Sequence, residues 1–298
     1  MGEQSDVRGT VRHFVEHASA FTELDPVVWD PISMATVLRS APQFGELVLD
    51  ACCGNGASAL ATAELVGPTG VVDAVDLSET MIELARERVE REAGQLPQLR
   101  LHAADVLEWE PTGYDLVQCV LGVFFFPDAD AGAQRLVERA KPGGRFAVTL
   151  WAPTALREFT KALCDAVESE GGDIGAAAVA DYRDRSRPEL PETPGALGQW
   201  LGALGLEHTR SELVPRHLDL DDDLAWKLVV GMSRARLIAD LDDEARDAVA
   251  ARFHEILAER KITRVDVSTL IGVGHVPASA PANANSNANA NANANPPR

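Results

Sequence analysis

The sequence has little positive charge and no apolar run long enough to cross a membrane. It contains 27 Lys and Arg residues against 46 Asp and Glu residues, and its formal net charge is −19. Nucleic acids and anionic membranes bind broad cationic surfaces, so this composition argues against both as partners. The N-terminus lacks the charged start, apolar centre and cleavage site of a secretion signal, and we expect a cytosolic protein.

Cysteine is scarce as well. Cys52, Cys53, Cys119 and Cys164 are too few and too irregularly spaced for a disulfide framework or a zinc site, so we expect reduced thiols and no bound metal. The adjacent pair at 52 and 53 is interpreted as small packing residues, because free cysteine commonly behaves as a small hydrophobe.

The composition changes sharply near the C-terminus. Apolar residues make up 46% of the sequence, which is enough to bury a sizeable core. Residues 277–298 instead alternate Asn and Ala without one large apolar side chain. Such a segment buries too little surface to offset its conformational entropy, and we expect a disordered tail.

Upstream of this tail, short apolar runs alternate with helical patterns. Strands are predicted at 47–51, 70–76, 99–103, 114–121 and 145–151. Helices are predicted at 58–66, 79–93, 129–140 and 154–170. Ser78 is suited to cap the second of these helices, and Gly94 to end it. The alternation predicts an α/β fold with a doubly wound, Rossmann-like, mostly parallel sheet of seven strands.

Two segments lie outside this repeat. Residues 1–42 are predicted to form an N-terminal helical cap on a main domain at 43–276. Within that domain, a helical insertion at 221–261 separates the last two strands, at 207–220 and 265–276. Ligands of open α/β sheets bind beyond the carboxyl ends of the strands, so the cap and the insertion either wall that site or simply cover the core.

The most informative segment is a strand, a glycine-containing turn, a helix and a second strand over residues 47–81. Gly54 and Gly56 let the backbone pass close to a ligand, where a side chain would collide. Asp76 follows 20 positions after Gly56, at the carboxyl end of the second strand, where it can accept hydrogen bonds from a ribose diol. The segment therefore indicates a nucleoside ligand.

Two kinds of nucleoside fit the glycine pattern. Residues 54–59 satisfy the G-x-G-x-x-G/A fingerprint, so a nicotinamide or flavin enzyme is one alternative. Asp50, however, ends the first strand, and two like charges about 4 Å apart repel by roughly 4 kcal/mol at an effective dielectric near 20. A pyrophosphate would be repelled by Asp50, whereas a ligand with an ammonium and a sulfonium would be attracted.

A series of short motifs follows between residues 50 and 151. They read DACCGNG at 50–56, VDLS at 75–78, ADV at 104–106, YDLV at 114–117, GVFFFPD at 122–128, KPGGR at 141–145 and a closing Trp151. In this order they resemble the class I S-adenosylmethionine-dependent methyltransferases. Within that class, the motif at 122–128 and Trp151 are most similar to small-molecule enzymes akin to the quinone C-methylating group. The chain departs from the usual first motif in having Cys52 and Cys53 where Gly or another small residue is common.

The resemblance implies S-adenosylmethionine as cofactor and S-adenosylhomocysteine as product. It implies that Asp50 orients the turn and the methionine amino group, that Asp76 holds the ribose, and that Asp105 accepts from the adenine amino group. The cofactor-binding residues it implies are Asp50, Ala51, Cys52, Gly54, Asn55, Gly56, Asp76, Leu77, Met81, Asp105, Val106, Cys119 and Val120.

The acceptor is predicted to be an apolar or aromatic small molecule, methylated at C, N or O, in bacterial secondary metabolism. The predicted acceptor-binding residues are Phe14, Phe21, Trp29, Phe125 and Tyr182. His17 is the predicted catalytic base, and the other candidates are His13, Tyr182, His217 and His275. The oligomeric state is expected to be a monomer or a homodimer.

Three functions thus stay open: a small-molecule methyltransferase, an NAD(P)-dependent oxidoreductase, and a non-catalytic protein that binds S-adenosylmethionine. Residues 119–122 read CVLG, which does not resemble the Asn/Asp-Pro-Pro-Tyr/Phe tetrapeptide of nucleic-acid amino-methylating enzymes. This departure also argues against a nucleic-acid substrate.

Overall fold

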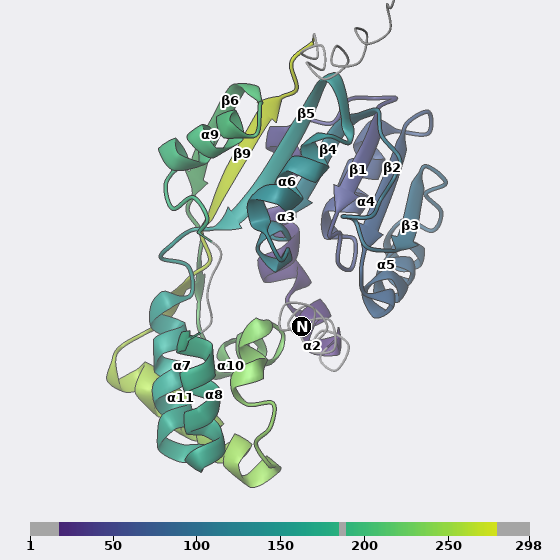
Figure 1. Cartoon of the computed structure of the whole chain (residues 1–298). Helices are drawn as coiled ribbons and strands as arrows, with labels where there is room; N and C mark the ends of the chain where they lie inside the picture. Colours follow the sequence, from purple (N-terminus) through teal and green to yellow (C-terminus); the bar gives the residue numbers. More distant parts are fainter. Residues whose placement is uncertain (1–17, 185–188, 279–298) are drawn as a thin grey trace, which may run out of the picture.

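A computed structural model describes residues 18–184 and 189–278. Phe14, His13, His17 and the tail from residue 279 onward lie outside the described residues. Figure 1 shows a sheet with helices on both faces and a separate lobe of helices at its lower left, beyond the end of β5. The predicted α/β class is confirmed.

The sheet has seven strands in the order β3-β2-β1-β4-β5-β9-β6. These strands are β1 (Leu47–Ala51), β2 (Val71–Asp76), β3 (Leu99–Ala103), β4 (Tyr114–Val120), β5 (Ala140–Trp151), β6 (Glu207–Val214) and β9 (Thr269–His275). The first five pair in parallel, and β9 runs antiparallel to both β5 and β6. The predicted doubly wound, mostly parallel arrangement is therefore present.

Helices cover both faces because side chains alternate along each strand. Val48 packs in the core on the side of α4 and α5, whereas its neighbour Leu49 packs on the side of α6 and α9. A buried hydrogen bond of 2.6 Å between Thr36 and Thr149 joins α3 to β5. The helices are α3 (Asp30–Ser40), α4 (Ala57–Val66), α5 (Glu79–Glu92), α6 (Ala129–Val137) and α9 (Pro194–Ala203).

The start of α5 follows its local sequence. The Ser78 hydroxyl accepts a hydrogen bond from the Met81 amide at 3.3 Å, which confirms the predicted cap. Met81, Ile82 and Ala85 are buried along one stripe of the helix. Gly94, with a φ of 70°, follows the end of the helix.

The lobe combines helices from two separate parts of the chain. Its elements are α7 (Arg157–Glu170), α8 (Gly172–Asp184), β7 (His217–Asp219), α10 (Asp222–Val230), the 3-10 helix η3 (Ser233–Leu237), α11 (Asp243–Glu259) and β8 (Arg264–Asp266). Phe159 of α7 meets Phe253 of α11 edge-on, with ring centroids 5.1 Å apart. The predicted helical insertion at 221–261 therefore packs on the segment that follows β5.

The structure differs from the sequence-based expectation in two places. No helix was predicted between residues 170 and 194, but α8 forms there, because Gly175 lets this helix approach α7 closely. A Cβ atom there would lie 2.6 Å from the Val167 carbonyl oxygen. The expected strands at 207–220 and 265–276 are each divided, and the short pieces β7 and β8 form a second, two-stranded sheet.

The N-terminal cap continues from α2 (Ala18–Glu23) through the π-helix η1 (Asp25–Trp29) into α3. Leu24, Val28 and Ile32 of this segment join the apolar core of the lobe. The cap thus connects the sheet to the lobe. In the described ranges, no helix is long and apolar enough to cross a membrane.

Candidate active site

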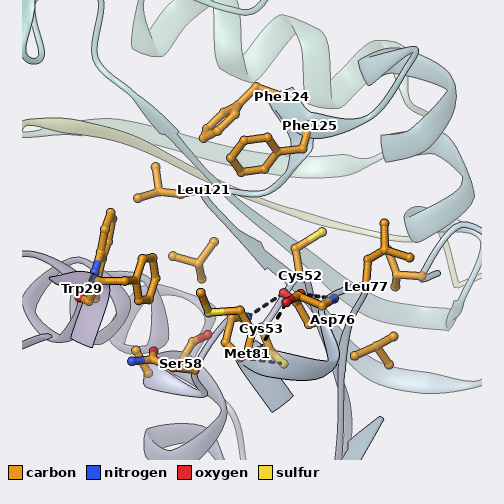
Figure 2. Close-up of a pocket in the computed structure, with 18 of the residues that line it drawn as sticks. Trp29, Cys52, Cys53, Ser58, Asp76, Leu77, Met81, Leu121, Phe124 and Phe125 are labelled. Carbon is orange, nitrogen blue, oxygen red and sulfur yellow. Dashed lines mark hydrogen bonds between the residues drawn. The ribbon is translucent and has the colours of Figure 1, made fainter. Parts of the chain in front are cut away.

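A cavity of about 680 Å³ lies at the carboxyl ends of β1, β2 and β4. The cap closes one side of it, and the segment after β4 together with η3 of the lobe closes another. In Figure 2, the rings of Phe124 and Phe125 lie across the open space from Cys52 of the glycine turn and from Asp76 at the end of β2. The predicted residues that line it are Phe21, Trp29, Cys52, Gly54, Asn55, Asp76, Leu77, Met81, Asp105, Val106, Val120 and Phe125.

The Asp76 carboxylate is hydrogen-bonded to the backbone of the glycine turn. Its Oδ2 atom accepts a hydrogen bond from the Gly54 amide at 2.9 Å, and its Oδ1 atom accepts one from the Ser78 amide at 2.9 Å. Burial raises the pKa of Asp76, while these two amides act in the opposite direction. Each carboxylate oxygen retains a second lone pair, so the side chain can still accept from a ribose hydroxyl.

The end of the cavity beyond β3 has the acidic and apolar groups that a purine needs. Asp105 accepts a hydrogen bond from the Leu107 amide at 2.8 Å and lines the cavity. Leu77 and Val106 line the same end. These are the positions at which the sequence predicted adenine contacts.

Asp50 lies behind the turn and does not line the cavity. It is fully buried, and its Oδ2 atom accepts a hydrogen bond of 2.7 Å from the hydroxyl of Ser58, which does line the cavity. Its Oδ1 atom is buried without a hydrogen-bond partner in the described part of the chain. Burial raises the pKa of Asp50 to about 7. A cation bound nearby would favour the ionised form of this buried carboxylate.

Cys52 occupies a strained position in the turn. Its φ of 56° lies in the left-handed region, which glycine adopts at lower cost. The neighbouring Cys119 thiol and burial both raise the pKa of the Cys52 thiol. A glycine at position 52 would therefore adopt this conformation with less strain than cysteine does.

Aromatic rings form the wall on the side of the cap. Phe21 stacks on Trp29 with centroids 4.7 Å apart and planes 18° apart, and the Trp29 indole donates a hydrogen bond to the Phe21 carbonyl at 3.0 Å. Trp29 meets Trp151 edge-on at 6.4 Å. A Cβ atom at Gly54 would lie 3.9 Å from the Phe21 ring, so this ring lies over the turn.

Other predicted site residues do not reach the cavity. Ala51 and Cys119 are fully buried. Gly56 immediately precedes α4, and a Cβ atom there would lie 3.3 Å from that of Ala85. Tyr182 packs against the core of the lobe. His217 and His275, two further candidate bases, are likewise not among the lining residues.

The sequence analysis did not identify which residues of the lobe line the cavity. Met232, Ser233 and Arg234 of the segment around η3 line the cavity, and the Arg234 guanidinium donates to the Thr160 hydroxyl at 3.0 Å. The predicted insertion at 221–261 contains these residues, but no local pattern distinguishes them from the rest of it. Among the described residues, no group of three or more His, Cys, Asp and Glu side chains could hold a metal ion.

Comparisons with known proteins agree with this geometry. Residues 48–144 match a methyltransferase domain family. Aklanonic acid methyltransferase DauC of Streptomyces sp. (strain C5) is 31% identical over 149 residues, which cover 50% of this chain and 68% of DauC. Demethylmenaquinone methyltransferase of Oceanobacillus iheyensis is 29% identical over 155 residues, 49% of this chain and 63% of that protein, so the chain spans less than two thirds of this relative.

Among solved structures, the YcgJ protein from Bacillus subtilis has a TM-score of 0.52 at 16% identity, with 83% of this chain and 98% of YcgJ covered. At this identity the likeness shows a shared fold alone. With the relatives and the strand order, it completes the assignment: the chain belongs to the class I S-adenosylmethionine-dependent methyltransferases that act on small molecules. S-Adenosylmethionine is its methyl donor, and the oxidoreductase alternative does not apply.

Proposed function

We propose that the chain methylates an apolar, aromatic small molecule held between the cap and the lobe. The observation that carries this proposal is the set of aromatic rings that line the cavity, which we call the acceptor wall. Phe21, Trp29, Phe124, Phe125 and Trp151 all contribute to it. Aromatic side chains bury large apolar areas and prefer offset or edge-on contact with other rings, so this wall suits a flat, apolar acceptor.

We propose that the cofactor lies along the ends of β1, β2 and β3. Asp76 would hold the ribose, Leu77 and Val106 would enclose the adenine, and Asp105 would accept from its amino group. The Ser58 hydroxyl already donates to Asp50, which leaves its oxygen able to accept from the cofactor's ammonium. The buried charge of Asp50 would thus reach the methionine end through Ser58.

The cofactor supplies an electrophilic methyl group on its sulfonium, and the chain's own residues align the acceptor with it. The apolar walls exclude water and hold the acceptor for in-line displacement. An acceptor oxygen or carbon needs a base, and His17 stays the predicted base, with Asp105 and Asp76 committed to the cofactor. Bacterial secondary metabolism, a cytosolic location and a monomeric or homodimeric state also stay predictions.

The comparison with DauC favours an acceptor with an acidic group. The name of the relative DauC states that its own acceptor is an acid. We therefore propose an acidic aromatic acceptor, and a panel for turnover should pair each acid with its amide.

Thermal denaturation with and without ligand tests the cofactor site. S-Adenosylhomocysteine should raise the melting temperature of the purified protein, and NAD should not. Asp76→Ala should weaken S-adenosylhomocysteine binding at least tenfold, since a hydrogen bond to a charged group contributes about 1.5–3 kcal/mol. If this variant binds as tightly as the parent, the proposed cofactor position is wrong.

Asp115→Ala is the matched control. Asp115 accepts from the Leu47 amide at 3.0 Å at the start of β4, far along the sheet from the carboxyl ends. Its loss should lower stability without changing the affinity for S-adenosylhomocysteine. Cofactor binding without a methylated product from any member of the acceptor panel would favour the non-catalytic alternative.

A further inference from the structure

A buried polar cluster joins the N-terminal cap to the glycine turn, which we also call the cofactor turn because we propose that the cofactor binds there. It consists of Asp25 at the start of η1, Asn55 in the turn and Arg88 on α5, and we refer to these three residues as the latch cluster. Their exposed fractions are 7%, 2% and 5%. Buried polar groups of this kind are costly unless they are paired, so their placement calls for an explanation.

Asn55 is the centre of the latch cluster. Its Nδ2 atom donates to both carboxylate oxygens of Asp25, at 2.8 and 3.0 Å. Arg88 lies 3.4 Å from Asp25 and is also paired with Asp30 at 2.6 Å. The cap is therefore attached to the turn through Asp25 and to α5 through both Asp25 and Asp30.

The stabilising contribution of the latch cluster is offset by its burial. Desolvation raises the pKa of Asp25 to about 6, although Asn55 and Arg88 both act to lower it. Buried ion pairs of this type contribute little net stability and more often determine one specific geometry. A geometric role is thus the better explanation for the cluster.

The latch cluster contacts the cofactor turn at Asn55, so the conformation of this turn is the geometry that it can determine. Asn55 stands between Gly54 and Gly56, whose φ values are 54° and 85°. Glycine restricts the backbone less than other residues do, so contacts to the Asn55 side chain between these two glycines help to fix the conformation of the turn. Asp76 holds the Gly54 amide from one side, and Asp25 holds Asn55 from the other.

We propose that Asp25 is a positioning residue, which acts through Asn55 to set the cofactor turn and couples cofactor binding to closure of the cap. This inference rests on the proposed cofactor position. The cap residues Phe21 and Trp29, on either side of Asp25, form the acceptor wall. Cofactor binding at the turn therefore also orders the wall that the acceptor needs, and the two ligands bind cooperatively.

Asp25→Ala and Asp30→Ala form a matched pair, because both remove a partner of Arg88 but Asp25 alone contacts Asn55. By isothermal titration calorimetry, Asp25→Ala should weaken S-adenosylhomocysteine binding at least tenfold, and Asp30→Ala by less than threefold. Asp25→Asn keeps one acceptor for Asn55 and should lie between Asp25→Ala and the wild type. This milder variant also decides the question should Asp25→Ala fail to fold.

Hydrogen exchange measures the coupling directly. In the wild type and in Asp30→Ala, S-adenosylhomocysteine should slow amide exchange in residues 25–37 at least fivefold. In Asp25→Asn, the same saturating ligand should slow it by less than twofold. If Asp25 only anchored the cap, its replacement would change the exchange rates equally with and without ligand, and this difference would not appear.

The outcomes distinguish a failure of the proposal for the latch cluster from a failure of the proposed cofactor site. If the wild type does not bind S-adenosylhomocysteine, the cofactor position is wrong and the latch is wrong with it. If the wild type binds but the two alanine variants lose affinity equally, Asp25 only anchors the cap. If Asp25→Ala binds as tightly as the wild type, Asp25 has no effect on the turn. Either of the last two results contradicts the proposed positioning role of Asp25 and leaves the proposed cofactor site unaffected.

Discussion

Gly122 packs so closely against Cys52 that a Cβ atom added at Gly122 would lie 2.6 Å from the Cβ atom of Cys52. The same atom would lie 2.7 Å from the Cys119 sulfur. The φ of Gly122 is −110°, which any residue can adopt, so the constraint is one of space. The end of β4 and the cofactor turn therefore meet without room for another side chain.

Gly122→Ala should for this reason disturb both folding and cofactor binding. Overpacking of a well-packed site costs about 1–3 kcal/mol. We expect the free energy of unfolding, measured by urea denaturation, to fall by that amount. We also expect weaker S-adenosylhomocysteine binding by calorimetry, because the displaced Cys52 belongs to the turn.

Gly202→Ala provides the control. Gly202 lies in α9, and a Cβ atom there would meet nothing within 4 Å. Alanine is favoured over glycine in helices by about 1 kcal/mol, so this variant should be as stable as the parent or more stable. Equal destabilisation by both substitutions would refute the packing argument.

Cys52→Gly should be more stable than Cys52→Ala. Both variants lose the sulfur, but alanine keeps the Cβ atom that makes a φ of 56° unfavourable. The expected difference in the free energy of unfolding is about 1 kcal/mol. At Cys53, whose φ is not in the left-handed region, the order should reverse. The same order at both positions would show that strain at Cys52 is negligible.

Proton release should accompany cofactor binding near neutral pH. Burial raises the pKa of Asp50 to about 7, and a cationic ligand nearby favours its ionised form. The ionised fraction rises about fivefold between pH 6 and pH 7, so S-adenosylmethionine should bind about fivefold more tightly at pH 7. Calorimetry in buffers of different ionisation enthalpy would count the released proton.

Asp50→Asn is the control for this pH dependence, and it also checks the sign for stability. Because the folded-state pKa of Asp50 exceeds the unfolded-state value, its ionisation opposes folding as the pH rises through 7. The variant should bind the cofactor with little change in affinity from pH 6 to pH 7. It should also lose less stability over that range than the parent. A parent with pH-independent affinity would contradict the role of Asp50.

Trp29→Ala should affect the acceptor more than the cofactor. Trp29 forms part of the acceptor wall, and removal of such an aromatic contact commonly costs 2 kcal/mol or more, roughly thirtyfold in affinity. With an acceptor from the panel, KM should rise at least tenfold while the Kd of S-adenosylhomocysteine changes less than threefold. Trp200→Ala, on the outer helix α9, should change neither.

Most of the sheet could be predicted because its signals are local. The strand at residues 47–51 was placed at its observed bounds, and Ser78 caps its helix as expected. Turn glycines, caps and apolar runs act over a few residues, so a single sequence contains them. The order of Asp50, Gly54 and Asp76 along the chain likewise predicted that these residues gather at the carboxyl ends of β1 and β2, where we propose that the cofactor binds.

The contacts that close the site were not predictable in the same way. Arg88 was one of several basic residues on its helix, and nothing nearby indicated that it meets Asp25 across 63 positions of chain. The helix α8 was missed because its glycines look like loop residues until α7 is packed beside them. Met232 and Arg234 reach the cavity only through the packing of the lobe.

The order of residues along the chain thus determined the sheet, the glycine turn and the acidic strand ends, because these depend on short-range conformational preferences. The tertiary structure alone decided which cap and lobe residues complete the cavity, and that Asp50 is shielded from it behind Ser58. Those arrangements depend on burial and on pairing between distant segments, for which a linear sequence contains no direct signal.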